Sequence, residues 1–376
     1  MIFRRRIIIE ADSIVTNKMS GIGHTTLELI RELENFNDKF KITIIVPYGK
    51  KRIVEKYGFK NVSVRSLPPG YKYVNYALTR TSLPIPVDII YGRGVYIFPN
   101  YKTWWLLFSR SITFIDDVVF KIYPETINPK NLAYLNANFD TWLKRSNKII
   151  TISRSAKKEF EKFFPLYINK VETVYLGINP SVFYPRDKNE ISKVLNKYNL
   201  PNKSFLFIGN LEPRKNILNL LEAYRSYCAI SKIKLPLLII GGDGWKNNDI
   251  HKKIKDLQKT GHKVIVPNKY VSDYDLPAIY TSATALVHVA IHEGFGLPPL
   301  QAQSCGTPVI ASNLSVFHEI LKKENTHYVD PTNINQISSF MIKAEKQFSR
   351  NRIKNRTNLT WENTVMNIFK IIDTMV

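Results

Sequence analysis

Short apolar runs alternate with amphipathic segments from the start of the chain. Residues 5–12, "RRIIIEAD", predict a buried strand, and residues 24–36, "HTTLELIRELENF", carry apolar side chains every three or four positions, which predicts a helix. Helices that alternate with strands are typical of a parallel sheet covered on both faces. Further strands are predicted at residues 40–47, 62–68, 87–92, 111–117, 148–153 and 170–177, and further helices at 52–58, 135–146 and 154–164.

The pattern breaks at residues 177–190, "GINPSVFYPRDKNE", where two prolines and several charged residues predict an interdomain linker. The alternation then restarts and predicts a second parallel sheet, so that 376 residues form two domains rather than one core. We place the domains at residues 1–183 and 184–358, followed by a final amphipathic helix in 359–376. Strands of the second domain are predicted at 204–210, 235–242, 262–268, 285–290 and 308–312, and helices at 217–230, 249–260, 276–283 and 299–306.

The formal charge of +23 is the unusual global property of this chain. An excess of lysine and arginine attracts polyanions such as phosphorylated ligands, anionic lipid headgroups or nucleic acid, and charge alone does not choose among them. The N-terminal apolar run is too short for a signal peptide and no run of eighteen apolar residues occurs, which predicts a cytoplasmic protein. Cys228 and Cys305 lie far apart in apolar contexts, and we expect buried thiols in a reducing compartment.

The stretch "HEGFGLPPLQ", residues 292–301, combines a carboxylate, a glycine turn and a helix start. Its two glycines allow a tight turn after a predicted strand, and its prolines fit the first turn of a helix. Loop amides and a helix start together favour an anion such as a phosphate. Glu293 does not suit a phosphate, but its carboxylate can accept hydrogen bonds from sugar hydroxyls.

The segment "HEGFGLPPLQAQSCGTPVIAS" resembles the signature of the retaining glycosyltransferases of family four, which have the two-domain GT-B fold. The resemblance covers nearly the whole chain, because "SGIGHTTLELIREL", "YPETI", "ITISRSAKKEF", "VYLGIN", "LFIGNLEPRKNILNLLEAY" and "YVDPTN" follow in the family's order. It implies an α/β GT-B chain with two Rossmann-like domains whose parallel sheets face each other across a cleft. The N-terminal domain would bind the acceptor, the C-terminal domain would bind the nucleotide sugar, and the last helix would pack back on the N-terminal domain.

The resemblance also implies roles for residues of the C-terminal domain. The family motif holds two glutamates, the first on the donor sugar and the second on the ribose; Glu293 matches the first, but the second position is Gln301, whose amide can accept a hydroxyl proton without charge. Arg214 and Lys215 would neutralise the leaving diphosphate, while Asn210 stands where many relatives have another arginine. The loop residues expected around the donor are Gly294, Phe295, Gly296 and Leu297.

In the N-terminal domain, Gly21 or Gly23 of the "SGIG" loop would let the backbone approach the donor phosphates. The spacing of these glycines does not fit a dinucleotide-binding fingerprint. Asp116 replaces the histidine that relatives usually carry before Asp117, and it could accept a sugar hydroxyl or offset positive charge developing at the anomeric carbon. Two adjacent acids with no third nearby do not make a convincing metal site, and His288 and His292 are interpreted as core or rim residues.

The resulting hypothesis is a metal-independent, retaining glycosyltransferase that needs no cofactor and uses a UDP-, GDP- or dTDP-sugar. It would transfer a hexose or deoxyhexose to a lipid-linked oligosaccharide or a similar glycan acceptor in polysaccharide synthesis, and its basic surface would bind the inner face of the plasma membrane peripherally. A nucleotide-sugar 2-epimerase of the same fold, a non-catalytic family member and a nucleic-acid-binding protein are the alternatives. The last lacks any helix-turn-helix, RNP or zinc-finger signature, and the sequence leaves the oligomeric state open.

Overall fold

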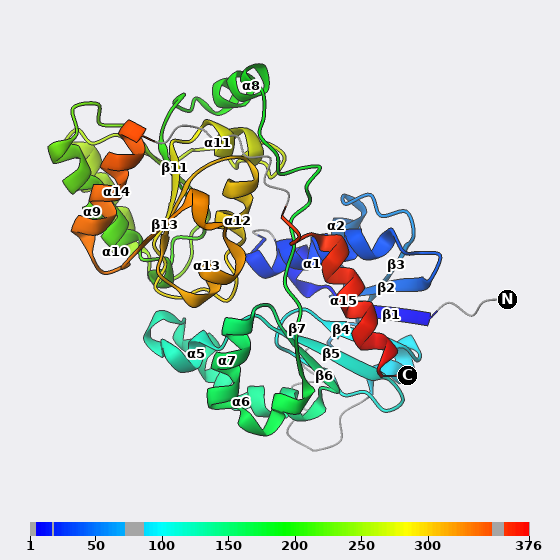
Figure 1. Cartoon of the computed structure of the whole chain (residues 1–376). Helices are drawn as coiled ribbons and strands as arrows, with labels where there is room; N and C mark the ends of the chain where they lie inside the picture. Colours follow the sequence, from blue (N-terminus) through cyan, green and yellow to red (C-terminus); the bar gives the residue numbers. More distant parts are fainter. Residues whose placement is uncertain (1–4, 17–18, 72–85, 348–356, 376) are drawn as a thin grey trace. The chain divides into compact units, whose positions relative to one another are not determined.

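The computed structural model describes residues 5–16, 19–71, 86–347 and 357–375, which form two compact units (Figure 1). Unit 1 comprises residues 1–118, 130–177 and 361–376, and unit 2 comprises residues 119–129 and 178–360. The passage between the units therefore lies at Gly177 and Ile178, ahead of the expected boundary after residue 183. The sequence pattern also gave no sign that residues 119–129 belong to unit 2.

Unit 1 is built on a parallel sheet in which the described strands follow the order β3-β2-β1-β4-β5-β6-β7. The central strand β1 is buried on both faces, since Ile7, Ile8 and Ile9 are all fully buried. Continuous apolar runs of this kind are expected where helices cover both sides of a sheet. The strands are β1 (Arg5–Glu10), β2 (Phe40–Val46), β3 (Val62–Ser66), β4 (Val95–Phe98), β5 (Arg110–Ile115), β6 (Lys148–Thr151) and β7 (Val171–Thr173).

Helix α15 (Trp361–Asp373) returns to unit 1, as expected for the end of the chain. Phe369 on this helix stacks on Phe40 with ring centroids 4.4 Å apart and meets Phe36 edge-on at 5.1 Å. The apolar stripe predicted from the sequence is thus the face that packs near α1 (Figure 1). The other unit 1 helices are α1 (Gly21–Glu34), α2 (Lys51–Glu55), α4 (Val87–Tyr91), α6 (Pro129–Arg145) and α7 (Arg154–Phe163), with 3-10 turns η1 (Asp12–Val15) and η3 (Pro165–Lys170).

The strand predicted at residues 87–92 is wrong, because this segment forms the helix α4 and β4 occupies the place in the sheet. A run of five apolar or mixed residues has no periodicity that separates helix from strand. Tertiary contacts decide the outcome. The buried Asp88 carboxylate accepts N–H groups from Leu107 and Phe108 at 2.7 to 3.2 Å, and Gly92 ends the helix with a φ of 88°.

Unit 2 holds a second parallel sheet, in which the described strands follow the order β10-β9-β8-β11-β12-β13. Its core includes Phe205, Phe207, Leu220, Tyr224 and Val287, all fully buried. The strands are β8 (Phe205–Ile208), β9 (Leu237–Ile240), β10 (Val264–Ile265), β11 (Ala285–His288), β12 (Val309–Ser312) and β13 (Thr326–Val329). The helices are α5 (Val119–Ile122), α8 (Lys188–Tyr198), α9 (Ile217–Ile230), α10 (Asn248–Lys259), α11 (Leu276–Ser282), α12 (Leu297–Ser304), α13 (Ser315–Ile320) and α14 (Ile334–Gln347), with 3-10 turns η2 (Pro124–Thr126), η4 (Pro213–Lys215) and η5 (Lys323–Asn325).

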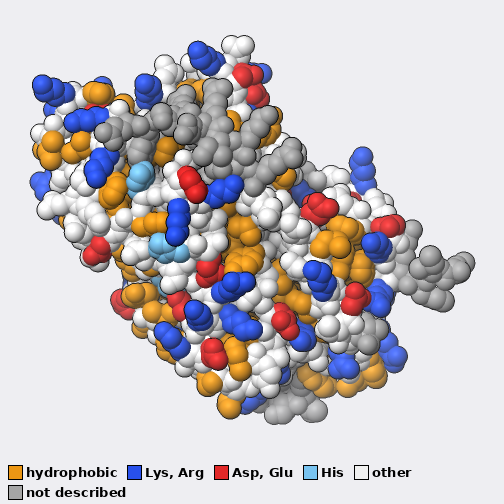
Figure 2. All heavy atoms as spheres, viewed as in Figure 1, with side chains coloured by type: hydrophobic (Ala, Val, Ile, Leu, Met, Phe, Trp, Pro, Cys, Tyr) orange, Lys and Arg blue, Asp and Glu red, His pale blue; other side chains and the backbone are white. Residues whose placement is uncertain are grey.

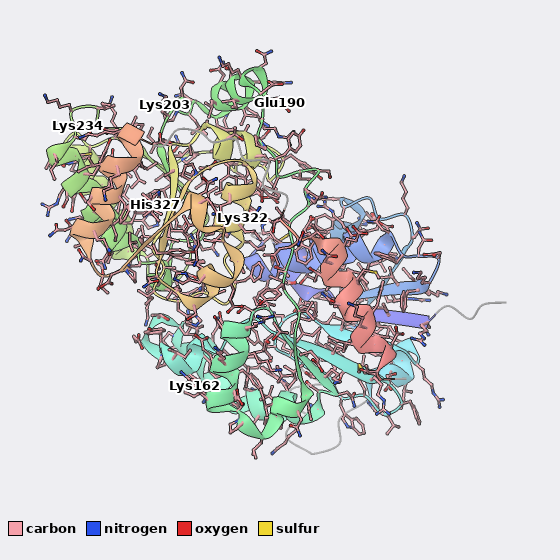
Figure 3. The ribbon with its side chains drawn as sticks, viewed as in Figure 1. Lys162, Glu190, Lys203, Lys234, Lys322 and His327 are labelled. Carbon is pink, nitrogen blue, oxygen red and sulfur yellow. The ribbon has the colours of Figure 1, made fainter. Side chains whose placement is uncertain are left out.

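The structure has the basic surface and the two buried thiols that were expected from the sequence. Lysine and arginine side chains are scattered over the face shown in Figure 2, and exposed examples include Lys162 and Lys322 (Figure 3). Cys228 and Cys305 are both buried and free. Within the described ranges, no helix has both the length and the apolar character needed to cross a bilayer.

Candidate functional site

Two loops of unit 2 meet where the neighbouring strands β8 and β11 end. The loop after β8 carries the turn η4, and the loop after β11 carries Glu293. The N–H of Ile291 donates to the Arg214 carbonyl at 3.0 Å, and the Asn216 side chain donates to the Val289 carbonyl at 2.9 Å. These hydrogen bonds fix one loop against the other, at the sheet edge where open α/β sheets bind ligands.

Glycines let the loop after β8 approach the loop after β9. A Cβ atom on Gly241 would lie only 1.9 Å from the Gly209 carbonyl oxygen, so no larger residue fits there. The N–H of Leu211 donates to the Gly242 carbonyl at 2.9 Å and continues the strand contact. Asn210, expected near the donor, lies within this glycine-supported loop and is partly exposed.

Glu293 lies at the centre of a buried charge network. Its Oε1 accepts hydrogen bonds from Lys215 Nζ at 2.5 Å and from His288 Nε2 at 2.8 Å, and its Oε2 accepts one from Arg214 at 3.0 Å. Burial by itself would raise the pKa of Glu293, but the charges of Lys215 and Arg214 and the His288 hydrogen bond hold it well below its usual value. The carboxylate therefore stays ionised although it is buried.

Arg214 and Lys215 differ in how fully the protein engages them. Arg214 also donates to the His292 carbonyl and to the buried carboxylate of Glu212, both at 2.8 Å. Arg214 thus joins the two loops. Among the described residues, Lys215 Nζ has Glu293 as its hydrogen-bond partner, and an ammonium group carries three donors. Of the two cations, Lys215 keeps more capacity for a ligand.

His288 belongs to this network, which the sequence analysis missed. The residue is completely buried at the end of β11, stacked near Phe207 and edge-on to Phe317. Burial lowers the pKa of His288, so the ring is neutral and donates its Nε2–H to the ionised Glu293. In the sequence, the only sign of this pairing is that His288 stands five positions before Glu293. The fold of the intervening loop is what brings the two side chains together. His292 lies beyond the strand, in the loop that carries Glu293, and is buried.

The helix start expected at the glycine motif is present as α12. Gly296 caps the helix with a φ of 98°, and a Cβ atom there would lie 2.5 Å from the Phe317 ring, so both conformation and space require glycine. Gly294 and Phe295 are buried, whereas Leu297 is partly exposed in the first turn. On the same helix, Gln301 Oε1 accepts a hydrogen bond from the buried hydroxyl of Tyr280 at 3.0 Å. Part of the acceptor capacity expected to meet the ribose is therefore already used.

The candidate residues of the first domain lie in unit 1. Gly21 and Gly23 are in the first turn of α1, not in a loop before it, with the Ser20 side chain capping the Gly23 N–H at 3.4 Å. A Cβ on Gly23 would lie 2.7 Å from the Ser13 carbonyl, while one on the exposed Gly21 meets nothing within 4 Å. Gly23 thus serves helix packing, and Gly21 is the one of the two open to a ligand.

Asp116 follows directly after β5 and is partly exposed. Burial of the carboxyl group and the neighbouring charge of Asp117 raise the pKa of Asp116 to about 7. The group therefore changes its charge near neutral pH. Within the described parts of the chain, no three His, Cys, Asp or Glu side chains are grouped in a way that could hold a metal ion.

The "YPETI" segment, residues 123–127, lies in unit 2 beside the network. The Tyr123 ring is 6.1 Å from that of His292, and Trp245 Nε1 donates to the Thr126 carbonyl at 2.6 Å. Lys246 Nζ donates to the carbonyl of the preceding residue, Glu125, at 2.6 Å. A segment that interrupts unit 1 in sequence thus completes the surroundings of the loop that holds Glu293.

Comparisons of the sequence and of the fold show which known proteins this chain resembles. Residues 187–359 match the family described as Glycosyl transferases group 1. The O-antigen chain mannosyltransferase B of Escherichia coli is 29% identical over 389 residues, covering 97% of this chain and all of that protein. The O-antigen chain mannosyltransferase RfbU of Salmonella typhimurium is 27% identical, over 66% of this chain and 64% of that protein.

Solved structures show the same fold. Anabaena HepE in complex with UDP and glucose superposes with a TM-score of 0.74 at 12% identity, covering 99% of this chain and 100% of that one. WaaG, a glycosyltransferase involved in lipopolysaccharide biosynthesis, has a TM-score of 0.71 at 14% identity, covering 97% and 99%. The two parallel-sheet units are therefore the Rossmann-like domains of a GT-B fold. Taken with the match to residues 187–359, they place this part of the chain in the family of group 1 glycosyltransferases, within a chain that has the GT-B fold.

Proposed function

We propose that this protein transfers mannose, with retention of configuration, from a nucleoside diphosphate donor to a growing bacterial surface polysaccharide. The relatives named O-antigen mannosyltransferases support the sugar and the product. The Glu293 network supports the site. It places one ionised carboxylate and two cations at the start of α12, and this combination can bind a sugar and its diphosphate side by side.

The proposal depends on one observation: Lys215 pairs with Glu293, while His288 and Arg214 also donate hydrogen bonds to Glu293. When a diphosphate attracts Lys215, the hydrogen bonds from His288 and Arg214 keep Glu293 in place. Its Oε1 then accepts a hydroxyl of the donor sugar, and Lys215 stabilises charge on the departing diphosphate. The N–H groups of Gly296 and Leu297, where α12 begins, provide a further partial positive charge for the phosphates, whereas Pro298 and Pro299 have no N–H to donate.

Asp116 is the residue of unit 1 that we assign to the reaction. Once ionised, it would offset positive charge that develops at the anomeric carbon. A leaving phosphate oxygen takes the acceptor proton, so the reaction needs no protein nucleophile.

The acceptor would be a lipid-linked glycan at an anionic membrane surface. Unit 1 presents the exposed apolar side chains of Ile89, Leu107 and Phe108, and Arg93 stacks on Phe108 with its guanidinium carbon 4.6 Å from the ring centroid. Apolar side chains beside cations suit the interface of an anionic bilayer. Co-sedimentation with vesicles should increase with phosphatidylglycerol content; binding that ignores the anionic lipid would contradict this part of the proposal.

Donor choice and the role of Glu293 are tested together. GDP-mannose should raise the melting temperature more than UDP- or dTDP-sugars. A ligand at a hundredfold its Kd adds about 2.7 kcal/mol of stability, so at equal concentration the donor with the lowest Kd gives the largest shift. Glu293→Gln should reduce mannosyl transfer at least about a hundredfold, while Glu324→Gln, an exposed acid of unit 2, should leave transfer unchanged. Near-normal transfer by a folded Glu293→Gln enzyme would remove this residue from the reaction.

A further inference from the structure

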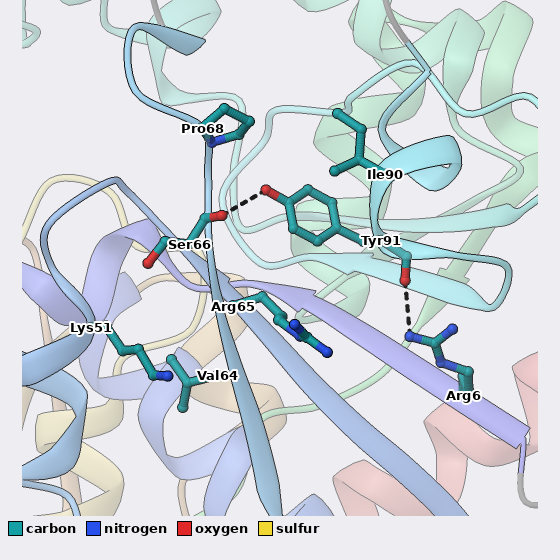
Figure 4. A pocket seen from close by; sticks show the side chains of 8 residues that line it. All are labelled: Arg6, Lys51, Val64, Arg65, Ser66, Pro68, Ile90 and Tyr91. Atoms are coloured by element: carbon teal, nitrogen blue, oxygen red, sulfur yellow. Dashed lines mark hydrogen bonds between the residues drawn. The ribbon is translucent and has the colours of Figure 1, made fainter.

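Unit 1 contains a cavity of about 510 Å³ that none of the residues discussed as donor contacts lines. Its walls come from β1, α2, β3 and α4, and the close-up in Figure 4 shows basic side chains on several of them. The volume lies within the range of small-molecule sites in proteins. The lining residues are Arg6, Lys51, Val64, Arg65, Ser66, Pro68, Ile90 and Tyr91.

The lining carries three positive charges and no acidic side chain. Lys51 and Arg65 are exposed, and within the described residues no acidic group pairs with either of them. Asp88 lies two positions before Ile90, but its carboxylate accepts hydrogen bonds from the N–H groups of Leu107 and Phe108. Like charges that share one cavity repel each other, and an anion between them would relieve this repulsion.

Arg6 is fixed in position by the fold. One Nη2–H donates to the Tyr91 carbonyl at 2.8 Å, and the Tyr91 hydroxyl donates to the Ser66 carbonyl at 2.8 Å, so the hydrogen bonds tie β1, α4 and β3 together (Figure 4). A Cβ atom on Gly92 would lie 2.4 Å from Arg6 Nη1, which shows how closely the backbone encloses the guanidinium. Arg6 Nε is buried and has no hydrogen-bond partner among the described residues.

We propose that this cavity binds a phosphate or diphosphate group. Two guanidinium groups match the geometry of phosphate oxygens, and a lysine adds a mobile point charge. Pro68 and Ile90 give the cavity an apolar wall. Such a wall suits the carbon part of a phosphate ester better than it suits a bare inorganic anion. The group belongs either to a soluble phosphate ester or to an anionic lipid headgroup. This site is separate from the donor site of the proposed function and does not depend on it.

The first test follows arginine side-chain Nε–Hε resonances of the full chain by NMR while pyrophosphate is added. Single arginine-to-lysine variants assign the Arg6, Arg65 and Arg214 signals. Saturable shifts of Arg6 and Arg65 are expected, and Lys51→Gln with Arg65→Gln should weaken this binding at least tenfold. Lys158→Gln with Lys162→Gln, which removes two exposed lysines from α7 of the same unit, should not. Shifts confined to Arg214, or none that saturate, overturn the proposal; the Arg214 signal reports the donor site separately.

Vesicles distinguish the two sources of phosphate. If co-sedimentation with phosphatidylglycerol vesicles falls in the Lys51/Arg65 double variant but not in the Lys158/Lys162 double variant, the bound group is a lipid headgroup. If pyrophosphate binds as expected and both double variants sediment equally, the cavity takes a soluble phosphate ester. Unchanged pyrophosphate affinity together with unchanged sedimentation in the Lys51/Arg65 variant contradicts both forms.

Discussion

His288 Nε2 lies 2.8 Å from Glu293 Oε1, and both side chains are buried. The pair links the end of β11 to the loop that follows it. His288 Nδ1 is also buried, with no hydrogen-bond partner in the described structure, so a second proton there would lack an acceptor. A neutral histidine is therefore built into the support of the carboxylate.

Replacing His288 by Phe keeps the ring between Phe207 and Phe317 but removes the donor to Glu293. We expect kcat to fall about tenfold, since a hydrogen bond to a charged group contributes about 1.5–3 kcal/mol, with a smaller change in the donor KM. His288→Gln, which retains an N–H donor, should restore part of the activity. Equal losses in both variants would indicate a packing role only. Steady-state kinetics on both variants provide the measurement.

His288 also predicts how stability depends on pH. Its folded-state pKa is lowered, so the unfolded chain binds the extra proton first as the pH falls below about 6.5. The stability of the wild type should therefore decrease on acidification through that range, and His288→Phe should lose this component. Thermal unfolding between pH 5 and pH 8 checks it; parallel curves for both proteins would contradict the assignment.

Arg214 and Lys215 should separate stability from donor binding. Arg214→Met leaves Glu212 and Glu293 without their shared cation, so unfolding free energy should fall by about 3–5 kcal/mol. Lys215→Met should instead mainly weaken nucleoside diphosphate affinity, at least about tenfold. Chemical denaturation and calorimetric titration measure the two effects. The reverse pattern would show that Arg214, not Lys215, meets the phosphates.

Asp116 should give the reaction a pH dependence near neutrality. With its pKa at about 7, the carboxyl group is mostly protonated at pH 6 and ionised at pH 8. If the ionised form acts, kcat/KM should rise through this range, and Asp116→Asn should be slower with a flat profile.

Asp116→Asn should also alter stability in a defined direction. A carboxyl pKa raised from 3.8 costs stability as the pH rises from about 4 through 7, because the unfolded chain releases its proton first. The asparagine variant should therefore gain stability relative to wild type at pH 8 and not at pH 4. A lower melting temperature at pH 8 would contradict this account of the group.

Gln301→Glu restores the charge that the family motif places on the ribose. Tyr280 occupies the single side-chain oxygen of Gln301, whereas a carboxylate at this position would keep a second oxygen for the ribose. We therefore expect Gln301→Glu to tighten nucleoside diphosphate binding by about tenfold through charge-assisted hydrogen bonds. Calorimetric titration of GDP measures this. Tyr280→Phe is the matched control, since it frees the Gln301 oxygen without adding charge. Unchanged affinity in Gln301→Glu would place Gln301 away from the ribose.

Most of the architecture could be predicted from periodicity alone. Apolar runs such as residues 5–12 and 204–210 became buried parallel strands, and the stripe on residues 361–376 became the buried face of α15. The failures include two helices that were not predicted, α8 (Lys188–Tyr198) and α14 (Ile334–Gln347), and one short segment that was given the wrong type. Residues 87–92 form a helix because Asp88 binds a loop about twenty positions away, a contact that no local pattern carries.

The sequence by itself determined the α/β alternation, the two-domain division and the glycine motif around Glu293, because buried strands, amphipathic helices and tight turns each impose a local composition. Only the tertiary structure decided that Glu293 is clamped by Lys215, Arg214 and His288, and that Arg6 and Arg65 share a cavity. Those charges come from strands and loops distant in the chain. Their pKa values and their pairing depend on burial and on distances of a few ångströms, which arise when the sheets form.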